Sequence, residues 1–224
     1  VPGVSRFPGV STVGGIIGQS YGRGARILAG LFSFVCCAGV VGAQMESMGM
    51  VFHVLLGIPE WAGILTGCGI VLLYTTFGGM QSVIAADILQ FILLAAGMPI
   101  LLFMGLREAG GLAPVLEAVP AAYFNPFNGT TLPGFLSMFL TMMFGEALAP
   151  PYTQRLLIGR NPRGTARGTI LSGLFSIPFF IVTGLIGFTA YALGTSADAA
   201  SAMPDLVQAV LPVGLRGVVM AAMV

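Results

Sequence analysis

Residues 74–90, YTTFGGMQSVIAADILQ, join two apolar runs through a pair of glycines and then place two polar residues one helical turn apart. Gly78 and Gly79 allow positive φ angles at little steric cost, so they predict a tight reversal of the chain. Asp87 and Gln90 lie three residues apart and therefore share one face of the helix that follows. The glycines alone are compatible with two interpretations, a plain helix hairpin and a turn with a functional role.

The composition of the chain excludes a soluble domain. Of the 224 residues, 56% are hydrophobic and 8% are charged, and the mean hydropathy is +0.96. A soluble domain carries about 25% charged residues. A net charge of +1 does not provide the basic patch of a nucleic-acid-binding protein. We therefore expect an integral membrane protein in contact with the lipid bilayer, with no nucleic-acid partner and no evident obligate protein partner.

Five segments are long and apolar enough to cross a membrane. A spanning helix needs about 20 apolar residues, because the hydrocarbon core is about 30 Å thick. The expected helices are residues 27–56, 61–77, 83–106, 133–158 and 169–194, and a sixth helix begins at 214. No soluble domain is visible between them. The chain begins without methionine and stops within an apolar run, so we expect a single incomplete membrane domain, an internal fragment of a longer protein.

The arginines predict how these helices are oriented. All nine basic residues are arginine, a composition typical of a GC-rich bacterial genome. Three arginines precede the first helix and four surround the loop after the fourth, so both groups fall on the same side of the membrane. The positive-inside rule makes that side cytoplasmic. We expect a multi-pass protein of the bacterial inner membrane, with these residues as topology determinants: Arg6, Arg23, Arg26, Arg155, Arg160, Arg163 and Arg167.

Three ordered stretches resemble one known family. LYTTFGGMQSVIAADILQ (73–90) is similar to the signature region of the sodium:solute symporter family, with Ala86 where the family has threonine before the aspartate. PPYTQRLLIGRNPRGTARGTILSG (150–173) resembles the family's Gln-Arg element, where a helix exits into a basic loop. YGRGARILAGLFSF (21–34) and AQMESMG (43–49) resemble the entry and the polar pattern of its third core helix.

The resemblance implies an all-α fold of two inverted five-helix repeats, of the leucine-transporter type. In such folds the first helix of each repeat is broken, and substrate and ions bind near the midplane of the membrane. By the order of the matches, the helices here correspond to core helices three to seven and the start of eight. The helix at 133–158 would then be the broken first helix of the second repeat.

That fourth helix is unusual independently of any family. Gly145, Glu146, Pro150 and Pro151 fall within one short stretch of a membrane span. Proline interrupts the helical hydrogen bonds, and opened backbone at membrane depth is tolerated where it is buried in protein or lines a wet cavity. A carboxylate there marks a functional site or a glutamate that snorkels beside a proline kink. The resemblance implies a substrate contact at Ala149, whose side chain cannot hydrogen-bond, so Glu146 is the alternative polar contact.

Other polar residues have two interpretations each. Asp87 and Gln90 either line an inward exit for the ion or form a first helical turn at the interface, where the helix dipole favours aspartate. Gln44 and Glu46 either face the pathway or lie near the outer interface. His53 is more typical of an interfacial residue than of a ligand.

The function that we expect is sodium-coupled symport of a small polar organic solute by alternating access. The residues contain no nucleophile–base arrangement, phosphate loop or metal cluster, so we expect no enzyme, no catalytic residue, no metal site in this fragment and no cofactor beyond Na⁺ as the coupling ion. One alternative is the transporter-like membrane sensor domain of a signalling protein. A channel is a further alternative, although it would need a repeated filter or a ring of charges.

Overall fold

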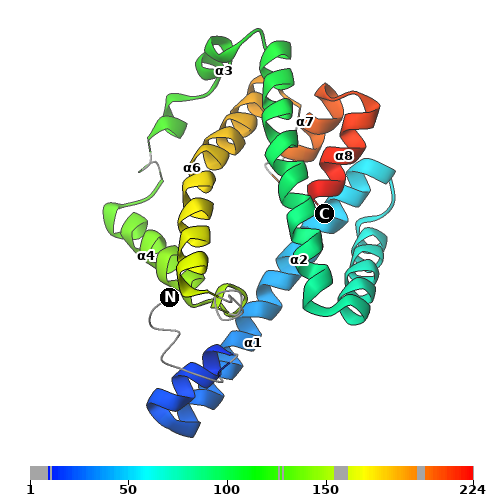
Figure 1. Cartoon of the computed structure of the whole chain (residues 1–224). Coiled ribbons are helices and arrows are strands. Elements are labelled where there is room, and N and C mark those ends of the chain that lie inside the picture. The colour runs from blue at the N-terminus through cyan, green and yellow to red at the C-terminus, as the bar shows by residue number, and fades with distance from the viewer. Residues whose placement is uncertain are drawn as a thin grey trace. The chain divides into compact units, whose positions relative to one another are not determined.

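The computed structural model describes residues 10, 12–125, 127, 129–153, 161–195 and 200–223, except for the side chains of 80 and 146–148. The regular secondary structure in these ranges is entirely helical (Figure 1). The chain divides into two compact units, and each is described by itself. Unit 1 contains Val1–Gly42 and Ala122–Ser176, and unit 2 contains Ala43–Ala121 and Ile177–Val224.

Four of the described helices are long and apolar enough to cross a membrane: Val13–Leu56, Glu60–Gly79, Gln81–Glu108 and Pro162–Leu193. These spans confirm an all-α membrane protein. The helix at Leu132–Leu148 is shorter, and residues 154–158 of the predicted fourth span lie outside the described residues. In chain order the elements are α1 (Val13–Leu56), α2 (Glu60–Glu108), α3 (Leu112–Ala118), the 3₁₀ helix η2 (Ala121–Phe124), α4 (Leu132–Leu148), α6 (Pro162–Leu193), α7 (Ala202–Val210) and α8 (Val213–Met223).

Two of these helices are interrupted by a glycine that reverses the chain. Gly22 in α1 has φ 87° and ψ −177°, and Gly79 in α2 has φ 56° and ψ −152°. At Gly79 the chain turns back on itself, so that α2 is a hairpin of two arms, Glu60–Gly79 and Gln81–Glu108 (Figure 1). The reversal expected from the paired glycines is therefore present.

The structure contains helix where the sequence suggested connecting segments. α1 begins at Val13 rather than near residue 27, because Val13–Tyr21 forms a short helical arm before the turn at Gly22. α6 begins at Pro162, where the side chain of Asn161 accepts a hydrogen bond from the backbone N–H of Arg163 at 3.0 Å. Asparagine at the cap followed by proline is a favourable helix start. Arg163 and Arg167 therefore lie on a helix rather than in a loop.

The core of unit 2 is formed by α2, α7 and α8 together with the C-terminal parts of α1 and α6. α7 is a short amphipathic helix whose Leu206 and Val207 are completely buried. Its Gln208 side chain donates a hydrogen bond to the backbone carbonyl of Val54, near the end of α1. The buried cluster comprises Val51, Met98, Leu101, Ile186, Ala190, Leu206, Val207, Leu211, Val219 and Met220.

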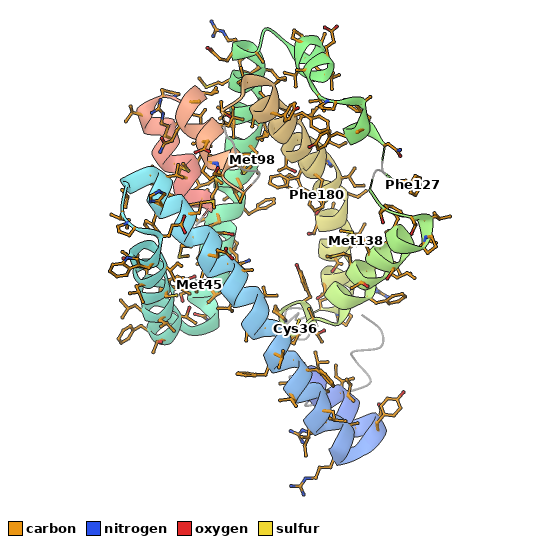
Figure 2. All side chains as sticks on the ribbon, turned by 180° about the vertical axis from the view of Figure 1, so that it is seen from behind. Cys36, Met45, Met98, Phe127, Met138 and Phe180 are labelled. Carbon is orange, nitrogen blue, oxygen red and sulfur yellow. The ribbon has the colours of Figure 1, made fainter. Side chains whose placement is uncertain are left out.

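The C-terminal part of α1 packs closely against the first arm of α2. A Cβ atom at Gly63 would lie 3.2 Å from Gly49 Cα, so the two backbones approach each other through these glycines. Further along α2, the Cys68 thiol contacts Met45 Sδ at 2.9 Å, and Met45 extends from α1 toward this arm (Figure 2). In lipid no hydrophobic effect drives helices together, so their association depends on van der Waals packing. Small residues at the crossing allow the close backbone approach that this packing needs.

Candidate functional site

The two glycines of the α2 turn have different structural roles. Gly79 has a backbone conformation that residues with a side chain rarely adopt, because its φ is 56°. Gly78 is constrained by space instead, since a Cβ atom there would lie 2.4 Å from both Cβ and Oγ of Ser82. The glycine pair is therefore needed for one positive φ angle and one close side-chain approach.

Ser82 connects the two arms of α2. Its Oγ lies 2.8 Å from the carbonyl oxygen of Tyr74 and 3.0 Å from that of Gly79, so its hydroxyl hydrogen is shared between two carbonyls at the end of the first arm. Gly79 ends the first arm, and a terminal helix carbonyl lacks an intrahelical partner that a hydroxyl can replace. In sequence the signal was a serine one turn after the paired glycines, and its bonding role was not predicted.

A Ser82→Ala variant is expected to be less stable by about 1 kcal/mol, because a neutral hydrogen bond contributes about that much and the carbonyls lose a donor. Thermal unfolding of the purified protein in detergent would measure this change. Ser47→Ala is the matched control, since Ser47 Oγ bonds the carbonyl of Ala43 four residues earlier within the same helix. Equal melting temperatures for the two variants would contradict a role of Ser82 in holding the turn.

Asp87 and Gln90 lie on the second arm of α2, and both side chains are half-buried. They are one turn apart on the same helix, and Asp87 is about two turns beyond the Gly79 reversal. Gln44 and Glu46 are on α1, and both are exposed. These four residues belong to unit 2.

The fourth predicted span is interrupted next to its two prolines. α4 ends at Leu148, Ala149 forms a bend, and a helical segment resumes at Pro150 and is described to Thr153. The Thr153 N–H donates to the Ala149 carbonyl at 3.2 Å, so the new segment starts from Ala149. Gly145 is exposed, and a Cβ atom added there would meet no atom within 4 Å. The Glu146 side chain lies outside the described positions.

Within the described chain, then, the predicted site residues fall into two groups. Gln44, Asp87 and Gln90 are in unit 2, whereas Glu146 and Ala149 are in unit 1. The described residues contain no group of three or more His, Cys, Asp or Glu side chains that could hold a metal ion. Each group remains a separate candidate, one at the α2 turn and one at the α4 break.

Comparison with known proteins supplies the context for these features. Residues 6–224 match the model of the sodium:solute symporter family. A curated relative, the high-affinity proline transporter PutP of Bacillus subtilis (strain 168), is 30% identical over 134 residues. That alignment covers 57% of this chain and 28% of PutP, so the chain corresponds to only part of the relative's length.

Proposed function

The chain belongs to the sodium:solute symporter family, and from this premise we propose that it forms part of a secondary active transporter that couples uptake of a small polar organic solute to Na⁺. The observation that carries the proposal is the family match over residues 6–224. It is supported by the apolar helices of the described residues and by the break of the fourth predicted span at Ala149. Discontinuous helices are where transporters of this kind bind substrate and ion.

The proposed mechanism is alternating access. Na⁺ binding favours an outward-open state and completes the solute site, and rocking of one group of helices against another then opens both sites to the cytoplasm. The backbone groups around Ala149 are available to a solute, because Pro150 has no N–H with which to continue the hydrogen bonds of α4. Asp87 and Gln90 on α2 are the residues that we assign to the inward exit of the ion.

The experiment that tests this function is uptake by the complete protein reconstituted into proteoliposomes. Labelled amino acids, vitamins and sugars are presented with an inward Na⁺ gradient, and then with the gradient abolished by an ionophore. Proline is the first solute to try, because PutP is named as a proline transporter. Uptake of one solute that collapses without the Na⁺ gradient is expected. Gradient-independent conductance would instead support the channel, and solute binding without uptake would support the sensor.

We expect Glu146 and Asp87 to control different steps. Glu146→Gln removes a charge beside the α4 break, where the solute is held, so the apparent KM for the solute should rise by roughly tenfold, the effect of losing one charged hydrogen bond of about 1.5 kcal/mol. Asp87→Asn removes a charge along the exit, so the maximal rate or its dependence on Na⁺ should change more than the KM. Initial uptake rates at several Na⁺ concentrations separate these effects. Glu46→Gln is a control carboxylate on α1, and the same kinetic change in all three variants would contradict this assignment.

A further inference from the structure

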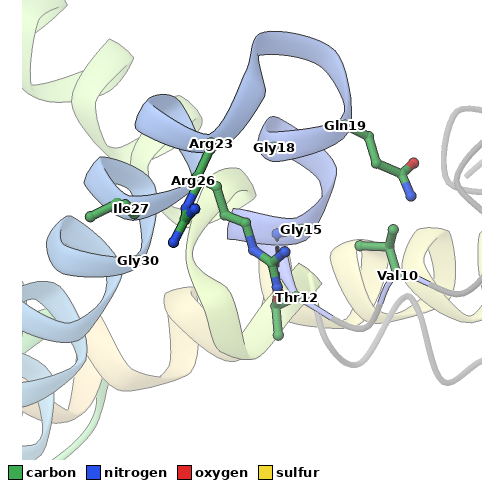
Figure 3. Close-up of a pocket in the computed structure, with 9 residues that line it drawn as sticks. All are labelled: Val10, Thr12, Gly15, Gly18, Gln19, Arg23, Arg26, Ile27 and Gly30. Atoms are coloured by element: carbon green, nitrogen blue, oxygen red, sulfur yellow. Dashed lines mark hydrogen bonds between the residues drawn. The ribbon is translucent and has the colours of Figure 1, made fainter.

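A hollow of about 930 Å³ lies at the start of α1 in unit 1, and none of the residues that line it is among those assigned to transport. Figure 3 shows the residues that line it. Val10 and Thr12 precede the short arm Val13–Tyr21, Gln19 lies on that arm, and Arg23, Arg26 and Ile27 lie on the helix that follows Gly22. Polar groups on its wall come from Thr12, Gln19, Arg23 and Arg26, and Ile27 adds an apolar edge.

The reversal at Gly22 forms this hollow by folding the short arm back along α1. A Cβ atom at Gly18 would lie 2.9 Å from Cβ of Arg26, and one at Gly14 would lie 3.4 Å from the Arg26 carbonyl oxygen. Glycine at these positions lets the aliphatic part of Arg26 pack against the short arm. The stem of Arg26 therefore lies beside the short arm, while the side chain as a whole is exposed, so its guanidinium is accessible to a ligand in the hollow.

The charge of unit 1 makes this hollow attractive to anions. Unit 1 contains seven of the nine arginines in the chain, and Glu146 is its one acidic residue. Because the Glu146 side chain lies outside the described positions, the described side chains of unit 1 offer Arg23 and Arg26 no carboxylate partner. Two guanidinium groups on one hollow suit a phosphate, whose oxygens accept bidentate hydrogen bonds from arginine.

The position of the hollow along the chain indicates where that phosphate comes from. After Arg26 the next charged residue is Glu46, and the intervening helix exposes large apolar side chains such as Ile27 and Leu31, at 62% and 57%. Tyr21, on the short arm, is 80% exposed, as is typical of an aromatic residue at a membrane interface. The hollow therefore lies at the water end of a membrane-spanning helix, where lipid headgroups are concentrated.

We propose that the hollow lined by Arg23 and Arg26 binds the phosphate of an anionic phospholipid, with the acyl chains lying along the exposed apolar surface of α1 that begins at Ile27. Basic pockets beside membrane-spanning helices are suited to anionic headgroups. A soluble phosphate would use the guanidinium groups equally well, but it would gain nothing from the apolar surface next to them. Dependence on acyl chains is therefore what separates the two sources.

The test uses the complete purified protein in a neutral detergent, titrated separately with dioctanoyl phosphatidylglycerol, dioctanoyl phosphatidylcholine and inorganic phosphate. Native mass spectrometry counts bound lipid, and microscale thermophoresis gives the affinities. We expect tighter binding of phosphatidylglycerol than of either other ligand. The double variant Arg23→Gln/Arg26→Gln should bind phosphatidylglycerol roughly 30-fold more weakly, because each arginine near an anionic surface contributes about fivefold to the affinity. The double variant Arg163→Gln/Arg167→Gln on α6 removes the same charge outside the hollow and should change the affinity for phosphatidylglycerol much less.

A second pair of variants keeps the charges and changes only the space. Gly30 lines the hollow with open space around it, so Gly30→Leu should fill the hollow and weaken phosphatidylglycerol binding. Gly24 is equally open but does not line the hollow, so Gly24→Leu should bind as the parent protein does. Equal binding of phosphatidylglycerol and phosphatidylcholine, or equal losses in both arginine double variants, would overturn the site. Binding of inorganic phosphate as tight as that of phosphatidylglycerol would overturn the lipid assignment.

Discussion

A Gly79→Val variant is expected to be less stable by about 3 kcal/mol and to transport less than the parent protein, because valine strains the α2 turn. At φ 56° and ψ −152°, Gly79 occupies a backbone region that residues with a Cβ atom reach at a cost of about 1–3 kcal/mol. The cost for valine lies at the upper end of this range, because its side chain branches at Cβ and crowds the backbone. A cost of about 3 kcal/mol shifts a folding equilibrium by roughly 100-fold.

The same helical arm contains a matched control for Gly79. Gly69 has ordinary helical geometry, and a Cβ atom there would meet no atom within 4 Å. Gly69→Val should therefore melt close to the parent protein, whereas Gly79→Val should melt at a clearly lower temperature. Gly79→Ala should fall between them. If Gly79→Val folds and transports like Gly69→Val, the reversal does not depend on the positive φ angle.

Much of this fold could be predicted from sequence, because the bilayer imposes a length on each apolar helix. The arms of α2 were expected at residues 61–77 and 83–106 and are found at Glu60–Gly79 and Gln81–Glu108. The reversal between them was also predictable, since paired glycines in an apolar run have few other uses. The resemblance to the family rested on this stretch together with residues 21–34, 43–49 and 150–173, and the match over residues 6–224 confirms the family.

Short and non-local features were not predictable. The arm Val13–Tyr21 was missed because its glycines and the following arginines are typical of a loop, and α7 was missed because nine residues are too few for a membrane span. The contact of Ser82 with the Tyr74 carbonyl depends on the turn closing first. For the candidate site, polar residues in apolar helices could be found individually. Their grouping could not be, because contacts between distant helices are not encoded in local periodicity.

The crossing of α1 and α2 provides the second large expected effect. Gly63→Leu should destabilise the protein by about 3 kcal/mol, the upper end of the usual cost of overpacking. A Cβ atom at Gly63 would lie 2.8 Å from Phe52 Cβ and 3.1 Å from the Gly49 carbonyl oxygen. The carbonyl belongs to the backbone of α1 and cannot rotate away, so the two helices must separate. Thermal melting in detergent, followed by size-exclusion chromatography, measures the loss.

Alanine substitutions along the same arm then distinguish backbone contact from side-chain contact. At Gly67 the added Cβ atom would overlap Met48 Sδ, the far part of a flexible side chain that can adopt another rotamer, and at Gly69 it would meet nothing within 4 Å. Alanine also favours helix over glycine by up to about 1 kcal/mol, so Gly69→Ala should be neutral or stabilising. The melting temperatures should therefore rank Gly69→Ala above Gly67→Ala, and Gly67→Ala above Gly63→Ala. If Gly67→Ala lowers the melting temperature as much as Gly63→Ala does, the Met48 side chain is held as rigidly as backbone. The crossing would then depend on side-chain packing rather than on the approach of Gly49 to Gly63.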